Sequence, residues 1–205
     1  EGKKYLQGIV RDISERKQYE LDIQERTQKL GEANRGLEIL NQCSFELASL
    51  LVGTPVYQVL TGYLKKMTGG VAVTFGEYDR GAKEIAVKQI LMETTLLSKV
   101  EKILGRPLID VRSPVSTKTY AIMLSEGAGV RYTLYDITFG AVPKLVSLAV
   151  GALLGIDRYL AVVYQTEGQL YGTSVVALKK GQPEPDLVIL KAFGSLGAVS
   201  LRRAQ

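Results

Sequence analysis

The side chains best suited to bind a small molecule gather in one stretch of the sequence, residues 112–139. Arginine can hold a carboxylate or phosphate through two parallel hydrogen bonds, and tyrosine combines an aromatic face with a polar hydroxyl. Six candidate ligand-binding residues lie there: Arg112, Tyr120, Arg131, Tyr132, Tyr135 and Phe139. Each of them is also of a type that packs on a neighbouring element or faces solvent. Whether these residues share a site depends on the fold that positions them.

Several kinds of chemistry are excluded by what the sequence lacks. Histidine is absent, so no residue can serve as a phosphoacceptor histidine, a histidine haem ligand, a histidine base or a zinc-binding histidine. Cys43 is the only cysteine, which excludes an internal disulfide and fits a buried small side chain. The carboxylates near the candidate pocket are isolated, and no glycine-rich phosphate loop accompanies them. We expect neither a metal site nor a catalytic centre in this chain.

Charge and hydropathy point to a protein that acts in solution. The net charge is +5, but the basic residues are scattered as doublets, whereas a nucleic-acid surface needs a basic patch. The longest apolar run, residues 141–156, contains Pro143 and Lys144 and is too short for a membrane span. We expect a cytoplasmic protein that binds no nucleic acid and does not insert into a membrane.

A heptad pattern begins at Tyr19 and continues for more than four repeats. Eight of its ten positions are apolar. The predicted seam consists of Tyr19, Ile23, Arg26, Leu30, Ala33, Leu37, Leu40, Ser44, Leu47 and Leu51. Such a seam favours a coiled coil between two copies of the chain, that is, a homodimer. The alternative is a helix packed on its own domain, and a second apolar stripe (Ile39, Cys43 and Leu50) indicates that the later turns do both.

The sequence after residue 52 predicts an α+β domain with an antiparallel β-sheet flanked by helices. Glycine, proline and aspartate mark the turns, and the spacing of apolar residues alternates between the helical period of about 3.6 and the strand period of about 2. We expect helices over 56–67, 94–104, 116–124, 141–154 and from 184 onward, a short strand over 108–111, and hairpins 71–78/84–92 and 159–166/170–178. The domain boundaries are then 1–15, 16–52 and 53–205, with a long N-terminal coiled-coil helix over 16–52.

Residues 5–17 read as a strand that leads directly into a charged helix. The wording Gly-Ile-Val-Arg-Asp-Ile-Ser-Glu-Arg-Lys from residue 8 to residue 17 closely resembles the C-terminal edge of a PAS domain. In that family the last strand runs into a signalling helix. The resemblance implies that residues 1–15 are the remnant of a PAS domain, that 5–11 form its last strand, and that 16–52 form a signalling helix.

The order of elements after residue 40 resembles a GAF domain, a small-molecule sensor module. The wording is most similar at residues 171–176, which resemble the family's Tyr-Gly strand, and at 185–193, which resemble its last helix. The resemblance implies a ligand site between the sheet and an inserted region, here residues 93–145. The signature of cyclic-nucleotide-binding members is missing. The domain also has no cysteine to which a bilin could be attached, because Cys43 lies on the helix that precedes it. The cofactor or ligand is therefore unknown.

Together the two resemblances imply a regulatory sensor module of a cytoplasmic signal-transduction protein. A two-component sensor histidine kinase is the expected parent, with the kinase outside this chain and a signal relayed through paired helices. A cyclic-di-nucleotide enzyme and a transcription regulator are alternative parents. A ligand-free dimerisation spacer is the alternative role for the domain itself.

Overall fold

The computed structural model describes residues 2–51, 53–182 and 185–204, with side chains for residue 13 and for residues 15 onward within those ranges. The chain divides after Glu38 into two compact units. The first unit is the N-terminal part of helix α1 (Gly2–Ala48). The second begins at Ile39 and holds the last turns of α1 together with the α+β domain.

The strand expected over residues 5–11 is wrong, because this segment forms the first turns of α1. A single strand leaves its backbone N–H and C=O groups unpaired unless a neighbouring strand accepts them, whereas a helix pairs them within itself. Within the described ranges, every strand belongs to one sheet that does not include this segment. The local structure is therefore helical, and the relation of residues 1–15 to a PAS domain stays a prediction.

In the described part of the chain, one antiparallel sheet is built from six strands in the order β3-β2-β1-β6-β5-β4. The strands are β1 (Ala72–Asp79), β2 (Glu84–Leu91), β3 (Arg112–Pro114), β4 (Ala128–Arg131), β5 (Ile156–Thr166) and β6 (Gln169–Lys179). Glu167 and Gly168 both adopt positive φ (52° and 73°) and join β5 to β6 in the two-residue turn that matches strand twist. The predicted α+β fold with an antiparallel sheet is confirmed.

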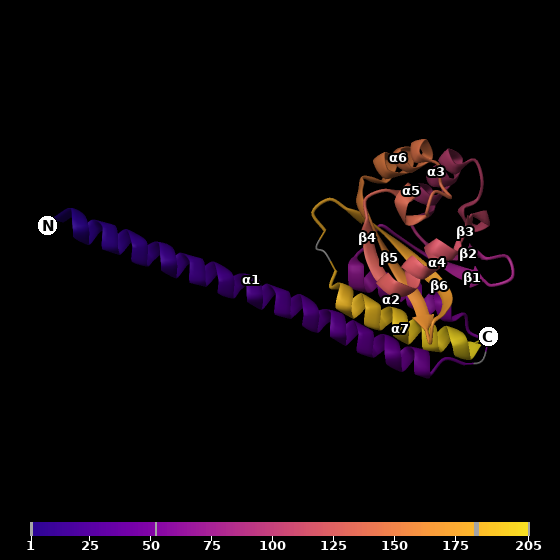
Figure 1. Ribbon diagram of the computed structural model, residues 1–205, viewed down its shortest axis with the longest axis horizontal. Helices are drawn as coiled ribbons and strands as arrows, with labels where there is room; N and C mark the ends of the chain where they lie inside the picture. Colours follow the sequence, from indigo (N-terminus) through magenta and orange to yellow (C-terminus); the bar gives the residue numbers. More distant parts are fainter. Residues whose placement is uncertain (1, 52, 183–184, 205) are drawn as a thin grey trace. The chain divides into compact units, whose positions relative to one another are not determined.

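Helices cover both faces of this sheet (Figure 1). One face carries α2 (Val56–Thr68), α7 (Leu187–Ala204) and the last turns of α1. The other face carries α3 (Thr94–Leu104), the 3-10 helix η1 (Leu108–Asp110), α4 (Thr117–Glu126), α5 (Leu134–Ile137) and α6 (Lys144–Leu154). No helix in the described ranges is long and apolar enough to cross a membrane.

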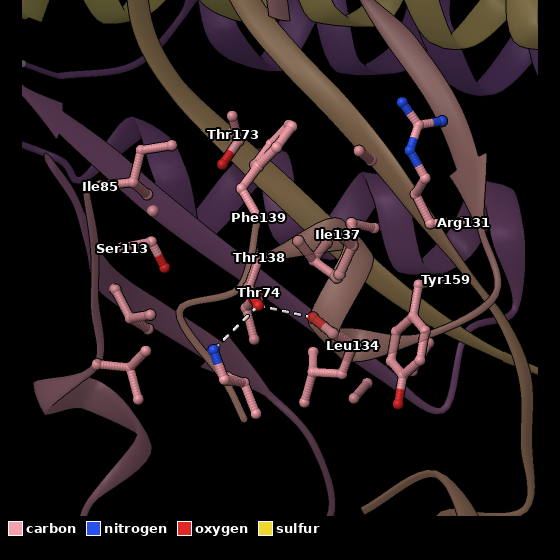
Figure 2. Close-up of a pocket in the computed structure, with 18 of the residues that line it drawn as sticks. Thr74, Ile85, Ser113, Arg131, Leu134, Ile137, Thr138, Phe139, Tyr159 and Thr173 are labelled. Atoms are coloured by element: carbon pink, nitrogen blue, oxygen red, sulfur yellow. Dashed lines mark hydrogen bonds between the residues drawn. The ribbon is translucent and has the colours of Figure 1, made fainter. Parts of the chain in front are cut away.

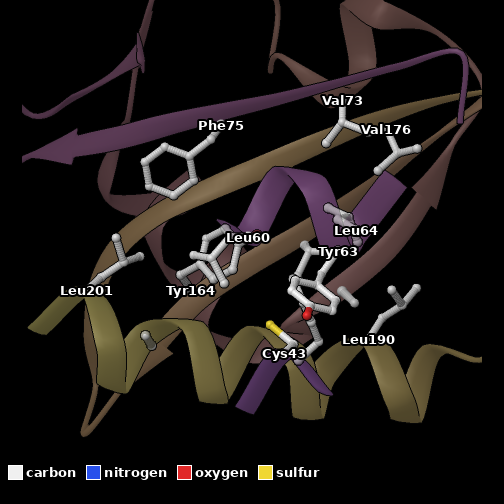
Figure 3. Close-up of a cluster of buried hydrophobic side chains, with 14 of the residues drawn as sticks. Cys43, Leu60, Tyr63, Leu64, Val73, Phe75, Tyr164, Val176, Leu190 and Leu201 are labelled. Atoms are coloured by element: carbon white, nitrogen blue, oxygen red, sulfur yellow. The ribbon is translucent and has the colours of Figure 1, made fainter. Parts of the chain in front are cut away.

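Large side chains fill the face toward α2 and α7. A run of aromatic contacts crosses it, with ring centroids 5.5 Å apart for Phe75 and Tyr164 and 6.3 Å apart for Tyr164 and Phe193. Figure 3 shows this cluster, with Cys43 of α1 beside α7. A Cβ on Gly194 would lie 2.5 Å from the Val163 carbonyl oxygen, so α7 sits as close to the sheet as a backbone can. On this face the helices and the sheet are therefore closely packed.

The region between α3 and α6 differs most from expectation. The strand predicted over 108–111 is the 3-10 helix η1, and β3 follows it. Two elements, β4 and α5, were not expected; in the sequence Gly127 and Gly129 indicated only the end of the preceding helix. Gly127 (φ 68°) ends α4, whereas Gly129 is a strand residue opposite Ala161, tucked beside the carboxylate of Glu126. The glycines thus mark a helix end and an edge strand.

Candidate functional site

A cavity of about 150 Å³ separates the sheet from the helices on its second face. All six strands contribute to its lining, together with α3, α4, α5, α6 and the loop before α6. Figure 2 shows the cavity with the sheet strands, the Leu134–Phe139 segment and Tyr159 around it. The site belongs wholly to the α+β domain.

Several small residues lie on the sheet side of the cavity, beside larger ones such as Val163, Val175 and Tyr159. Consecutive side chains of a strand point to opposite faces, so each central strand contributes one set to the packed face and another to the cavity. In β1, Val73 and Phe75 are fully buried in the packed core, while Thr74 and Gly76 line the cavity. Further small residues on the cavity side are Ala72, Ala161, Thr173 and Ala177. These small side chains leave part of the space between the sheet and its cover unfilled.

Apolar side chains of the inserted helices cover the cavity. Val100, Val150 and Leu154 are buried in a cluster that joins α3 to α6. The Tyr135 N–H donates to Ser147 Oγ (3.0 Å), which ties α5 to α6. The cover is therefore a small folded layer with its own contacts.

The loop between α5 and α6 is held by Thr138. Its hydroxyl donates to the Leu134 carbonyl (2.7 Å) and accepts from the Val142 N–H (3.2 Å), the two bonds drawn in Figure 2. Phe139 follows with φ 50°, a left-handed conformation that is uncommon for a bulky residue. Its ring lines the cavity and remains 40% exposed. Phe139 thus stands where the cavity meets solvent.

One ion pair lies at another edge of the cavity. Arg131 Nη2 is 2.6 Å from Glu126 Oε2, and Arg131 Nη1 donates to the Val130 carbonyl (2.9 Å). Both side chains are partly exposed. The guanidinium is therefore already bound on two sides.

Tyr159 is the most unusual polar residue of the lining. Its side chain is buried, and its hydroxyl finds no hydrogen-bond partner among the described residues. Burial raises the pKa of Tyr159 to about 12, because the phenolate would be desolvated. The hydroxyl lies near Gly151 of α6, where an added Cβ would be 4.0 Å away.

Two of the six candidate ligand-binding residues, Arg131 and Phe139, line the cavity. Arg112 lies outside the lining, with its Nε 3.6 Å from Glu84 and its Nη1 donating to the Ile109 carbonyl (3.0 Å). The Tyr120 hydroxyl donates to the Gly168 carbonyl (3.2 Å) and so connects α4 to the β5–β6 turn.

The other two tyrosines also stand apart from the cavity. Tyr132 is 76% exposed. Tyr135 makes a cation–π contact with Lys144, whose ammonium lies over the ring, 5.1 Å from its centroid. Two of the six predicted residues thus line the cavity, and Arg112, Tyr120 and Tyr135 contact neighbouring elements instead. Among the polar lining residues that sequence reasoning missed are Thr74, Thr173 and Tyr159; for the two threonines the available signal was their place among small residues at alternate strand positions.

The predicted dimer seam falls into an exposed and a buried part. Tyr19, Ile23, Leu30 and Leu37 are more than half exposed, Arg26 is exposed and Ala33 is half-buried. Leu40 and Leu47 pack on the core of the α+β domain, as do Ile39, Cys43 and Leu50. Ser44 is half-buried, and Leu51 lies beyond the helix end and is 81% exposed. The unpaired apolar surface is therefore in the N-terminal unit.

Cys43 is fully buried, and burial raises the pKa of its thiol to about 12. It is a packed side chain between α1, α2 and α7, well away from the cavity. Among the residues that the structure describes, no three His, Cys, Asp or Glu side chains are grouped to hold a metal ion.

Comparison with known proteins identifies the fold. No family model matches the sequence, and no curated protein matches it. Two similar solved structures are chromophore-binding domains of bacteriophytochromes. The domain from Stigmatella aurantiaca gives a TM-score of 0.58 at 11% identity, with 83% of this chain and 60% of that chain covered. The domain from R. palustris gives 0.57 at 9% identity, with 83% and 62% covered.

At these identities the similarity shows the fold alone. The chain spans about 60% of the length of the solved structures it matches. Those domains contain a GAF domain, and the likeness to them confirms the GAF-like α+β architecture expected from the sequence.

Proposed function

We propose that this chain is the regulatory sensor module of a signal-transduction protein, in which the cavity binds a small molecule. The cavity is the observation that carries the proposal. It lies between two layers of the fold, is largely apolar and is lined by a few polar groups, as small-molecule sites usually are. The two solved neighbours are chromophore-binding domains, which favours a ligand-binding role for this fold.

The strands offer a physical connection between the cavity and α1. Thr74 lines the cavity while its neighbours Val73 and Phe75 belong to the packed core. That core also contains Cys43 and Leu47 of α1. If the strands have two arrangements, a ligand that binds one of them more tightly increases its population. The packed core then transmits the change to α1.

We further propose that the parent protein is a two-component sensor histidine kinase acting as a homodimer. The PAS-like wording of residues 8–17 and the heptad that follows support this proposal. The exposed apolar side chains of Tyr19, Ile23 and Leu30 offer a surface that a second copy of α1 would cover. The kinase itself would lie outside these 205 residues, since no histidine is present to accept a phosphate.

A thermal-shift screen of the intact chain against a metabolite library tests the sensor function. A compound present at about 100 times its Kd stabilises the fold by about 2.7 kcal/mol, which gives a clear rise in Tm. The Ala161→Leu variant fills the cavity and abolishes the shift, while Tyr132→Ala, at an exposed position outside the lining, keeps it. A shift that survives Ala161→Leu would contradict binding in the cavity.

The exposed seam favours a second candidate, a dimerisation spacer without a ligand. In that case no compound in the library raises the Tm, yet the chain sediments as a dimer. The Ile23→Lys/Leu30→Lys double variant then sediments as a monomer, since both side chains lie on the exposed seam. A wild-type monomer at high concentration would contradict the paired-helix part of both candidates.

A further inference from the structure

We propose that the ligand of the cavity is a neutral, mostly apolar molecule the size of one or two rings that carries a hydroxyl or carbonyl group. The inference rests on the proposed function and narrows it to a chemical class. It excludes the carboxylates and phosphates that Arg112 and Arg131 suggested from the sequence.

The charges around the cavity oppose an anion. Within the described lining, the charged residues are Glu126 and Arg131, and they are paired to each other at 2.6 Å. A bound carboxylate would have to displace Glu126 from Arg131 or remain without a counter-ion. Burying an unpaired charge among apolar groups is far more costly than burying a neutral polar group with a partner. The paired edge therefore selects against anions.

Hydroxyl groups with free hydrogen-bonding capacity line the same cavity. Thr74, Thr173 and Ser113 belong to β1, β6 and β3, and their side chains make no hydrogen bond to any described residue. Thr138, by contrast, uses its hydroxyl within the α5–α6 loop. Figure 2 shows the hydroxyls of Ser113 and Thr173 turned toward the space between the sheet and the Phe139 loop.

These hydroxyls are suited to a neutral polar group. A serine or threonine hydroxyl both donates and accepts, so it pairs equally well with an alcohol or a carbonyl. The buried Tyr159 hydroxyl adds one more donor beside α6. The sheet side of the cavity thus carries polar points without carrying charge.

The size of the cavity limits the apolar part of the ligand. An apolar cavity of about 150 Å³ in another protein binds benzene. The volume here is about the same, and the small side chains at Ala72, Ala161 and Ala177 leave room above the sheet for a ring. A mono- or bicyclic ring, or an acyl chain of similar volume, fits this space.

Three probes of nearly equal size separate the alternatives: toluene, benzyl alcohol and benzoate. Their binding to the intact chain at pH 7 is measured by isothermal titration calorimetry and by protein-observed NMR. We expect benzyl alcohol to bind at least tenfold tighter than benzoate and more tightly than toluene. Thr173→Val should weaken benzyl alcohol three- to tenfold with toluene unchanged, and Ser113→Ala gives the same test should Thr173→Val fail to fold. Thr117→Val, an exposed threonine on α4, is the matched control and should change nothing.

The outcomes distinguish this inference from the function on which it rests. Benzoate binding tighter than benzyl alcohol, with loss of that binding in Ala161→Leu, would overturn the neutral ligand class and still support a ligand site. Equal binding of toluene and benzyl alcohol would overturn the role of the hydroxyls. Absence of binding by all three probes up to their solubility would overturn the inference, and the metabolite screen then decides whether the sensor function falls with it.

Discussion

The two faces of the sheet are built from the same strands and differ in how completely they are filled. Toward α2 and α7, Phe75, Tyr164 and Phe193 touch one another, and helix backbone meets strand backbone. Toward α3 and α6, several strand positions hold alanine, glycine or threonine beside larger residues such as Val163 and Tyr159, and a cavity remains. Protein interiors are ordinarily packed as densely as crystals of small molecules, so the difference between the two faces comes from the sizes of the side chains on each. One face is filled by large side chains, and the other leaves a cavity.

A pair of phenylalanines gives the largest expected difference between the faces. Phe193→Ala removes a fully buried ring from the packed core and should lower the free energy of unfolding by about 3–5 kcal/mol. Phe139→Ala removes a ring that is 40% exposed at the cavity mouth, and we expect it to cost under about 1 kcal/mol. Urea unfolding followed by circular dichroism measures both. Equal losses would mean that the cavity face is as closely packed as the other.

Two helical glycines test how closely α7 approaches the sheet. The Gly194→Ala methyl would lie 2.5 Å from a backbone oxygen, so we expect a loss of about 1–3 kcal/mol from overpacking. Gly62→Ala in α2 meets nothing within 4 Å and should gain about 0.5–1 kcal/mol from helix propensity. The same unfolding experiment compares them. A neutral Gly194→Ala would show that α7 can move away from the sheet without cost.

Alkaline pH should destabilise the protein through its buried tyrosines. The folded state raises the pKa of Tyr159 from 10 to about 12, so the stability linked to the protonated phenol is complete below pH 10. It is lost as the pH rises through 12, at about 1.4 kcal/mol per pH unit for each such group. Unfolding free energies from pH 9 to pH 11.5 give this slope. Tyr159→Phe should make the slope shallower, and an unchanged slope would show that Tyr159 ionises as freely folded as unfolded.

The hydroxyls of Tyr164 and Tyr159 should respond oppositely to removal at neutral pH. Tyr164 is hydrogen-bonded to Ser174 (2.9 Å) within the packed core, so Tyr164→Phe should cost about 1 kcal/mol. The Tyr159 hydroxyl is buried without a partner in the described structure, so Tyr159→Phe should be neutral or stabilise by up to about 1 kcal/mol. A clear loss in Tyr159→Phe would mean that its hydroxyl is satisfied after all.

Much of the fold is predictable from the sequence because its signals are local. The two long hairpins, α2, α3 and α7 follow from apolar spacing and from turn residues, and a register of period two leaves little choice of face. The strand expected at residues 5–11 failed because a strand depends on neighbouring strands, and those of the described ranges all belong to the sheet of the α+β domain. The edge strand β4 was hidden by Gly129, whose role depends on the nearby Glu126 carboxylate.

The site was only half predictable for a related reason. Arginines and tyrosines draw attention in a sequence, yet Arg112 and Tyr120 find partners close to their own elements. The cavity itself is made by what is absent, namely bulk at Thr74, Ala161 and Ala177. An empty volume depends on residues far apart in sequence, so only their arrangement in the sheet reveals it.

The most direct test of the account is a methyl NMR titration of the intact chain with benzyl alcohol. The methyl groups of Val87, Ile137 and Val150 line the cavity, while those of Leu64, Val73 and Leu190 lie in the packed core. We predict saturable shifts in the first set, with Ala161→Leu removing them, and much smaller changes in the second. Shifts confined to the packed core, or shifts that persist in Ala161→Leu, would contradict the cavity as the ligand site.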